Sequence, residues 1–115
     1  MSNSASKPTD LSESDEVLMT FFKVLGNPTR IRIVRALLEK ERTVSELAKL
    51  LNMPQGSVSR DLASIKLSGY VKARREWTTI HYQITDERLK EIVSLAREII
   101  ADHAENLYTR TRIKR

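Results

Sequence analysis

The spacing of apolar residues changes period along this chain, and that change limits the folds open to it. From Val17 to Leu67 the apolar residues recur at intervals of three and four, which is typical of amphipathic helices. After Gly69 they alternate with polar residues up to Ile84, which indicates two strands joined by a short turn. From Asp86 onward helical spacing returns. A chain with this order of elements is mainly helical and carries one small β-hairpin.

Capping residues divide the first helical half into separate helices. The first helix is apolar from Val17 onward and is closed by Gly26, since glycine is typical of helix C-termini. Asn27 and Pro28 are a cap and a first-turn residue for a second helix, which we expect to end near Glu41. These signals predict two consecutive helices with a short connection.

A second pair of helices follows. Thr43 and Glu46 have the spacing of a capping box and therefore mark the start of a third helix. The sequence NMPQG ends that helix, and a fourth helix is predicted over residues 55–67. Two helices joined by so tight a turn indicate a helix-turn-helix.

The fourth helix has two unlike faces. Val58, Leu62 and Ile65 lie on one side at the spacing of a buried stripe. Gly56 and Arg60 fall on the opposite side, among serines and an alanine. Small side chains let a helix backbone approach a partner closely, and Arg60 adds one long cationic arm. This pattern favours a contact surface.

Positive charge is concentrated in the middle of the 115-residue chain. Residues 23–85 hold 12 basic and 5 acidic side chains, whereas residues 1–16 hold one lysine and four carboxylates. A basic centre suits a polyanionic partner such as DNA. There is no cysteine, which excludes disulfides and thiolate metal sites, and no apolar run has the length of a signal peptide or a membrane span. We expect a soluble cytoplasmic protein, associated with the nucleoid, that binds no membrane.

The length fits one domain with short extensions. Serine, proline and acidic residues gather in residues 1–12, which we predict to be a disordered arm. A single domain is expected over residues 13–109, followed by a basic tail over residues 110–115.

The last predicted helix carries an apolar arc too wide for a small domain to cover. We therefore expect it to pack against a second copy of itself. Its stripe consists of Leu89, Ile92, Ala96, Ile99 and His103.

Three segments of the chain match one protein family in order and spacing. They read FKVLGNPTRIRIVRALLE, TVSELAKLLNMPQGSVSRDLASIKLSGYVKARRE and IHYQI, and the match covers roughly residues 21–84. They resemble the arsenic and zinc sensor (ArsR/SmtB) family of bacterial and archaeal repressors. The resemblance implies a winged helix-turn-helix fold, dimerising through its first and last helices. It also implies that the helix of residues 55–67 enters the major groove and that the hairpin of residues 71–84 lies along the DNA backbone as a wing.

The resemblance places DNA contacts on the fourth helix and on the wing. Arg60 is expected to make a bidentate contact to guanine, and Ser57 and Ser59 to hold phosphates. The expected DNA-binding residues are Gln55, Gly56, Ser57, Ser59, Arg60, Lys72, Arg74 and Arg75. The expected dimer interface comprises Val17, Phe21, Leu89, Ile92, Ala96, Ile99 and His103.

Two positions depart from the family pattern. Asp61 stands where many members have a histidine, and phosphate would repel its carboxylate unless a cation neutralises it. The wing tip reads REW where the family usually has a glycine turn, so we expect Trp77 to pack at that tip or to touch a partner. His81 is predicted to lie beside cations on its strand, which favours a phosphate contact or no role over a metal.

A metal site in the last helix is an alternative. The family's best-known site uses carboxylates and histidines at the two ends of that helix, shared across the dimer, and this chain offers Asp86, Glu87, Asp102 and His103 there. One imidazole with carboxylates makes a poor zinc site. We therefore expect no metal and no cofactor, with a metal-responsive repressor as the alternative.

These features predict a homodimeric repressor of transcription that binds double-stranded DNA at an inverted-repeat operator, with half-site centres about one helical turn apart. The sequence names no small-molecule or metal effector. An alternative from another class is a winged-helix protein-interaction module whose basic face meets an acidic partner. An enzyme is excluded, because two histidines without cysteine or a glycine-rich phosphate loop supply no nucleophile and base.

Overall fold

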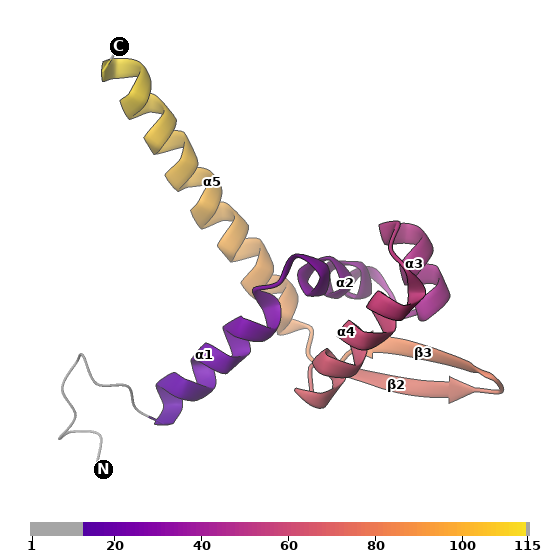
Figure 1. Cartoon of the computed structure of the whole chain (residues 1–115). Helices are drawn as coiled ribbons and strands as arrows, with labels where there is room; N and C mark the ends of the chain where they lie inside the picture. Colours follow the sequence, from indigo (N-terminus) through magenta and orange to yellow (C-terminus); the bar gives the residue numbers. More distant parts are fainter. Residues whose placement is uncertain (1–12, 115) are drawn as a thin grey trace. The chain divides into compact units, whose positions relative to one another are not determined.

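The computed structural model describes residues 13–114, with side chains described for residues 13–106. The chain divides into two units, Met1–Thr85 and Asp86–Arg115. The predicted arm of residues 1–12 lies outside the described residues. The elements are α1 (Glu13–Leu25), α2 (Pro28–Glu39), β1 (Arg42–Thr43), α3 (Val44–Leu51), α4 (Gln55–Leu67), β2 (Val71–Glu76), β3 (Thr79–Ile84) and α5 (Arg88–Lys114) (Figure 1).

The core of the first unit lies between α2, α3, α4 and the start of the sheet. The predicted stripe of α4 is confirmed, because Val58, Leu62 and Ile65 are all 0% exposed. The other fully buried side chains are Ile33, Val34, Leu47 and Val71. Burying such side chains contributes roughly 1.5–3 kcal/mol each, so this small set of contacts fixes the position of α4 against α2 and α3.

The predicted helix starts are confirmed. The Asn27 side-chain oxygen accepts hydrogen bonds from the backbone N–H groups of Thr29 and Arg30 at 2.9 and 3.0 Å, at the start of α2. Thr43 and Glu46 form the expected capping box of α3. α2 ends at Glu39, two residues before the predicted end.

Arg42 explains why the chain leaves α2 early. Its guanidinium donates to the Ala36 carbonyl at 3.0 Å and lies 2.6 Å from the Glu39 carboxylate. A cation on the last carbonyls of a helix stabilises its C-terminus. The Arg42 backbone is then extended and pairs with β3.

The sheet has three strands, whereas the sequence predicted a two-stranded hairpin. The strand order is β1-β3-β2, and β1 pairs antiparallel with β3. A strand of two residues is too short to show an alternating pattern, so β1 left no signal in the sequence.

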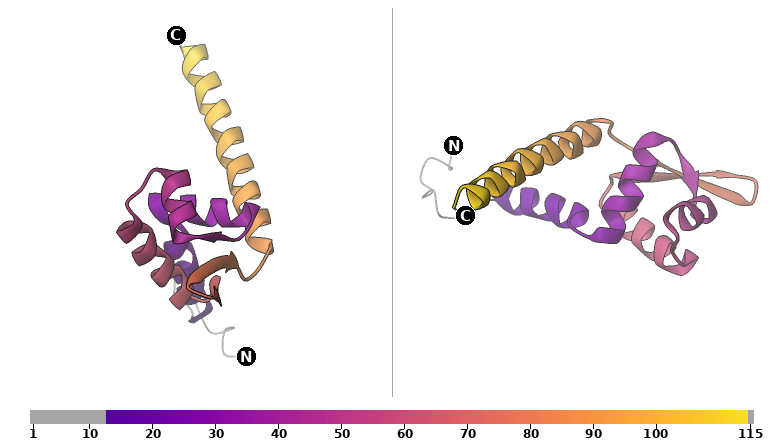
Figure 2. Two further views of the ribbon diagram at one scale, coloured as in Figure 1. Left: turned by 90° about the vertical axis from the view of Figure 1, so that its right-hand side faces the viewer. Right: turned by 90° about the horizontal axis from the view of Figure 1, so that it is seen from above.

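The hairpin of β2 and β3 is regular up to a very short turn. Its register runs from Val71 opposite Ile84 to Glu76 opposite Thr79, so only Trp77 and Thr78 connect the strands. The hairpin projects away from α2, α3 and α4, with the turn at its far end (Figures 1 and 2).

The second unit contains one long helix, α5. Its start is capped by Asp86, whose carboxylate accepts from the Arg88 backbone N–H at 3.0 Å and pairs with the Arg88 guanidinium at 2.6 Å. The side-chain and backbone hydrogen bonds from Arg88 lower the pKa of Asp86 to about 2. α5 continues to Lys114, past the predicted domain end at residue 109. None of the helices in the described part of the chain combines the length and the apolar character needed to cross a membrane.

Candidate nucleic-acid interface

The face of α4 opposite the core is open to solvent. Of the expected DNA-binding residues there, Gln55, Gly56, Ser59 and Arg60 are exposed and Ser57 is half-buried. The buried residues of the same helix hold it against the core, so these side chains have a fixed outward direction. The two faces inferred from the sequence are therefore present in the structure.

The first turn of α4 is left uncapped by side chains. Its N-cap is Pro54, whose carbonyl accepts from the backbone N–H groups of Ser57 and Val58 at 3.1 and 3.2 Å. The Gln55 amide donates to the Ser45 hydroxyl of α3 at 3.3 Å. A Cβ added at Gly56 would meet no atom within 4 Å, so the fold does not require glycine there. The positive end of the helix is accessible to an anion such as phosphate.

Arg60 is the cation of this face. Among residues 13–106 it forms no ion pair and no hydrogen bond. Its guanidinium is therefore available to a partner. A free guanidinium on an outward helix face has the donor geometry to bind two acceptors in one plane, such as a guanine edge or a phosphate.

The register of the hairpin separates the expected wing cations onto two faces. Side chains alternate along a strand, so Lys72 and Arg74 share one face of β2, and Arg75 lies on the other with Val71 and Ala73. Val71 is buried and Ala73 half-buried, so Arg75 extends the face that packs on the helices. Three cations that are close in sequence thus have different surroundings.

Arg74 is held by carboxylates of its own chain. Its guanidinium lies 2.5 Å from Glu41 and 3.1 Å from Glu76. The hydrogen bond that Arg74 donates to Glu41 raises the pKa of Arg74 most, and the hydrogen bond to Glu76 raises it further. His81 lies 3.6 Å from each of the same carboxylates.

His81 has both a cation and carboxylates as neighbours. The sequence placed His81 beside cations, and Arg74 lies opposite it across the hairpin, but Glu41 and Glu76 flank it as well. Glu41 is 33 positions from Arg74, so no local pattern could reveal this cluster. By contrast, Lys72 and Arg75 are exposed and form no ion pair with any described residue.

The residues expected at a dimer interface fall into two groups. Val17, Ile92, Ala96, Ile99 and His103 are exposed, with Val17 at 67% and Ile99 at 61%. Phe21 is half-buried and packs edge-to-face on Phe22 and on Tyr70, with ring centroids 5.3 and 5.2 Å apart. Leu89 is only 3% exposed. Large apolar residues that the sequence stripe omitted are also exposed, namely Leu18, Met19, Phe22, Leu95 and Ile100.

The metal candidates of the last helix are not assembled in a single chain. Within the described residues, no three His, Asp or Glu side chains lie close enough together to hold an ion. Asp86 precedes α5 and His103 lies well along it, and a helix rises about 1.5 Å per residue, so a shared site would need a second copy. Asp86 is moreover already paired with Arg88.

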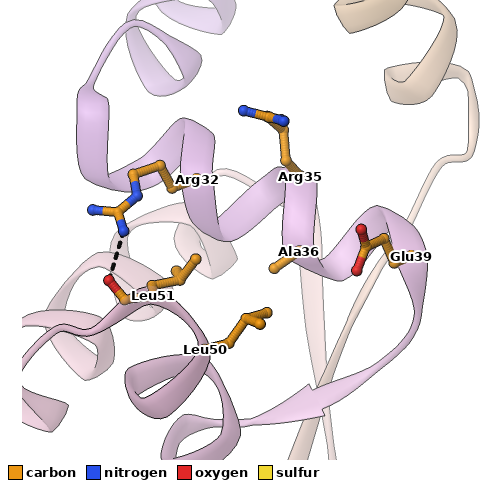
Figure 3. Close-up of a pocket in the computed structure, with 6 residues that line it drawn as sticks. All are labelled: Arg32, Arg35, Ala36, Glu39, Leu50 and Leu51. Atoms are coloured by element: carbon orange, nitrogen blue, oxygen red, sulfur yellow. Dashed lines mark hydrogen bonds between the residues drawn. The ribbon is translucent and has the colours of Figure 1, made fainter.

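A small pocket lies between α2 and α3 (Figure 3). Its volume of about 240 Å³ is below the usual range of small-molecule sites. Arg32 crosses its edge and donates to the Leu51 carbonyl at 2.5 Å. Glu39 faces the pocket but is already paired with Arg42. The remaining lining residues are Arg35, Ala36 and Leu50.

A family model and a curated relative match this chain. The model describes a bacterial regulatory protein of the arsR family and matches residues 27–73, from the cap of α2 into β2. A probable mercury resistance operon repressor of Streptomyces lividans is 38% identical over 93 residues, which span 81% of this chain and 74% of that protein.

Solved structures are also similar to most of this chain. The crystal structure of Rv0081 from Mycobacterium tuberculosis has a TM-score of 0.76 and 29% identity, covering 83% of this chain and 96% of that one. A Mycobacterium bovis structure is described as a homodimeric winged helix-turn-helix DNA-binding domain of a possible ArsR-family regulator. Its TM-score is 0.69 at 28% identity, covering 87% of this chain and 95% of that one.

Proposed function

The chain belongs to the arsR family of bacterial regulatory proteins, and from that premise we propose that it represses transcription as a homodimer on an inverted-repeat operator. Membership establishes a DNA-binding transcriptional regulator and not an enzyme. The proposal adds the residues that contact DNA, the homodimer as the DNA-binding form, and repression as the result at the promoter.

The open face of α4 is the observation that carries the proposal. Val58, Leu62 and Ile65 anchor the helix, while Arg60 and the small residues around it face outward. A major groove admits one α-helix and presents paired acceptors on guanine that a free guanidinium can bind. In this proposal α4 lies in the major groove, with Arg60 at a guanine and Ser57 and Ser59 at phosphates.

The wing contributes through its free cations. Lys72 and Arg75 bind phosphates beside the groove, because no carboxylate of the described chain neutralises them. Arg74 joins them more weakly, since it would have to exchange Glu41 and Glu76 for phosphate. Each phosphate contact releases condensed counterions, so affinity falls as salt rises.

Exposed apolar side chains on α1 and α5 support a dimer. Ile92, Ile99 and Ile100 of α5 and Val17 of α1 are between 38% and 67% exposed, and large aliphatic surfaces of this kind are buried by partners. The related Mycobacterium bovis domain is homodimeric. Two-fold symmetry of the protein requires an inverted repeat in the DNA, with half-site centres about one helical turn apart.

Selection of DNA by the purified protein tests the proposal. Sheared genomic DNA is incubated with the full chain at physiological salt, and bound fragments are sequenced. We expect enrichment of one inverted repeat upstream of a small number of genes, and a steep loss of binding as salt rises. Recovery of bulk DNA with no preferred sequence would contradict the proposed operator binding.

A charge placed on α5 tests the dimer. Ile99→Glu puts a carboxylate into the proposed apolar interface, so it should yield a monomer in sedimentation equilibrium. Ser94→Glu adds the same charge to another exposed position of α5 and should leave the dimer intact. An Ile99→Glu protein that still sediments as a dimer would exclude the proposed α5 contact.

The proposal assigns no effector. The Streptomyces lividans relative is named for mercury resistance, but this chain has no cysteine to supply the thiolate that soft metal ions prefer. Any effector would have to bind the DNA-competent and incompetent states unequally in order to release the operator.

A further inference from the structure

The tip of the hairpin carries the chain's one tryptophan. Trp77 is 90% exposed, the second most exposed large apolar side chain of the described residues. With Thr78 it forms the turn that joins β2 and β3. Among the described residues no other aromatic ring packs on it. The fold therefore gains little from so large a side chain at this place.

The backbone at Trp77 is also unfavourable for a bulky residue. Its φ of 62° lies in the left-handed region, whereas the next turn residue, Thr78, has no positive φ. Glycine is the usual residue at the first position of a two-residue hairpin turn with this pattern, because any Cβ there is crowded. A strained residue whose large side chain is 90% exposed indicates a role outside the chain.

On the basis of the proposed function, we propose that Trp77 inserts its indole ring into the minor groove of the operator, where it acts as the apolar anchor of the wing. The minor groove is about 6 Å wide, so a flat ring can enter it edge first and pack against the sugars. Apolar side chains at the ends of projecting elements enter minor grooves in this way and deform the base steps they touch.

The surroundings of Trp77 favour DNA over a protein partner. Arg75 lies on the adjacent strand with a free guanidinium, and an arginine beside a narrow minor groove is attracted by its negative potential. The one carboxylate next to the turn, Glu76, is already paired with Arg74, so it offers little repulsion to phosphate. Thr78 and Thr79 add hydroxyls that can donate to phosphate oxygens.

Intrinsic fluorescence reports the contact directly, because the chain has one tryptophan. The full protein is titrated with the unlabelled duplex selected from genomic DNA, and in parallel a fluorescein-labelled copy of that duplex is followed by anisotropy. We expect the tryptophan emission to be quenched and shifted to the blue, with the same midpoint as the anisotropy change. Unchanged emission while anisotropy reports binding would overturn the proposal.

Substitutions separate an anchoring role from a structural one. Trp77→Phe keeps an aromatic ring and should bind within a factor of about two of the original protein. Trp77→Asn removes the ring but tolerates a positive φ, so it should lose affinity on the order of tenfold while the unfolding midpoint stays the same or rises by a few °C. If Trp77 served only to hold the turn, Trp77→Asn would lower that midpoint and leave the affinity of the folded protein unchanged.

Two further comparisons complete the test. Leu50→Asn removes an exposed apolar side chain of α3, a helix to which we assign no DNA contact, and should leave affinity unchanged. Absence of binding by anisotropy, at any salt, would count against the proposed function itself rather than against Trp77 alone. Emission that is silent to DNA but shifts with a bound protein would overturn the minor-groove assignment.

Discussion

The two helices of the helix-turn-helix, α3 and α4, begin in opposite ways. At the start of α3 the Thr43 hydroxyl accepts from the Glu46 backbone N–H, and the Glu46 carboxylate accepts from the Thr43 N–H. α4 begins after Pro54 with no side-chain cap, and its second residue is Gly56. The first turn of α3 is thus closed by its own side chains, whereas no side chain accepts from the backbone N–H groups in the first turn of α4.

This difference separates residues that hold the fold from residues that face a partner. The capping box orients α3, on which α4 rests through Leu47 and other core residues. The exposed face of α4 forgoes such stabilisation, because serines and a glycine are poor helix formers and its cation is unpaired. Substitutions in α3 should therefore change folding stability, and substitutions on the open face of α4 should change DNA binding.

Arg60→Ala should have the largest effect. Loss of a bidentate contact to one base costs roughly 1–3 kcal/mol of discrimination against the wrong base pair. We expect competition binding assays to show that preference at one or two positions of the operator disappears. The unfolding midpoint should not change, since Arg60 has no partner among the described residues.

Arg60→Lys is the matched control for charge. Lysine keeps the attraction to phosphate but lacks the planar fork, so this variant should keep most non-specific affinity and still lose discrimination. If Arg60→Ala and Arg60→Lys both kept the original base preference, α4 would not read bases through this residue.

The sequence predicted those features of α3 and α4 that depend on residues close together in the chain. Asn27 and the Thr43 and Glu46 pair act within one helical turn, so their spacing identified both caps. The periodicity of Val58 and Leu62 identified the buried side of α4 for the same reason. The winged fold followed from the order of such local signals.

Other features depend on tertiary contacts or on conformation that no spacing reveals. β1 depends on tertiary contacts, because Arg42 donates to a carbonyl near the end of α2 and both Arg42 and Thr43 pair with β3. Arg74 looked like a free wing cation, but Glu41 reaches it from a distant part of the chain. The positive φ of Trp77 could not be read from a tip that lacks glycine.

Thr43→Ala tests the stabilising side of the comparison. Removing an N-cap hydroxyl costs about 1 kcal/mol, so the free energy of unfolding from urea denaturation should fall by that amount. Affinity for DNA, measured where the variant is fully folded, should remain the same. Thr43→Ser restores the hydroxyl and should recover most of the stability, and a Thr43→Ala protein of unchanged stability would mean that the cap contributes nothing.

Gly56→Ala tests the open face of α4. It should raise folding stability and weaken DNA binding. The added Cβ meets no atom within 4 Å, and alanine is the better helix former, so stability should rise by a few tenths of a kcal/mol and at most about 1. The same methyl group stands on the open face, where it should weaken binding to the operator. Ser94→Ala, a comparable exchange in α5, should leave affinity unchanged, and tighter binding by Gly56→Ala would show that the glycine is not needed for close approach.

The smallest effect concerns the charge within the cap of α3. The hydrogen bond from the Thr43 backbone N–H lowers the pKa of Glu46 below its ordinary value of 4.5, so the folded state holds this carboxylate ionised more strongly than the unfolded chain does. The resulting stability is fully present above pH 4.5 and is lost as the pH falls through the lowered pKa of the folded state.

Glu46→Gln keeps an acceptor oxygen but no charge. Urea midpoints of the original protein and of Glu46→Gln are measured at successively lower pH across that window. The stability advantage of the original protein over Glu46→Gln should decrease as the pH falls. A stability difference that stays the same at every pH in that window would mean that the charge of Glu46 contributes nothing to the first turn of α3.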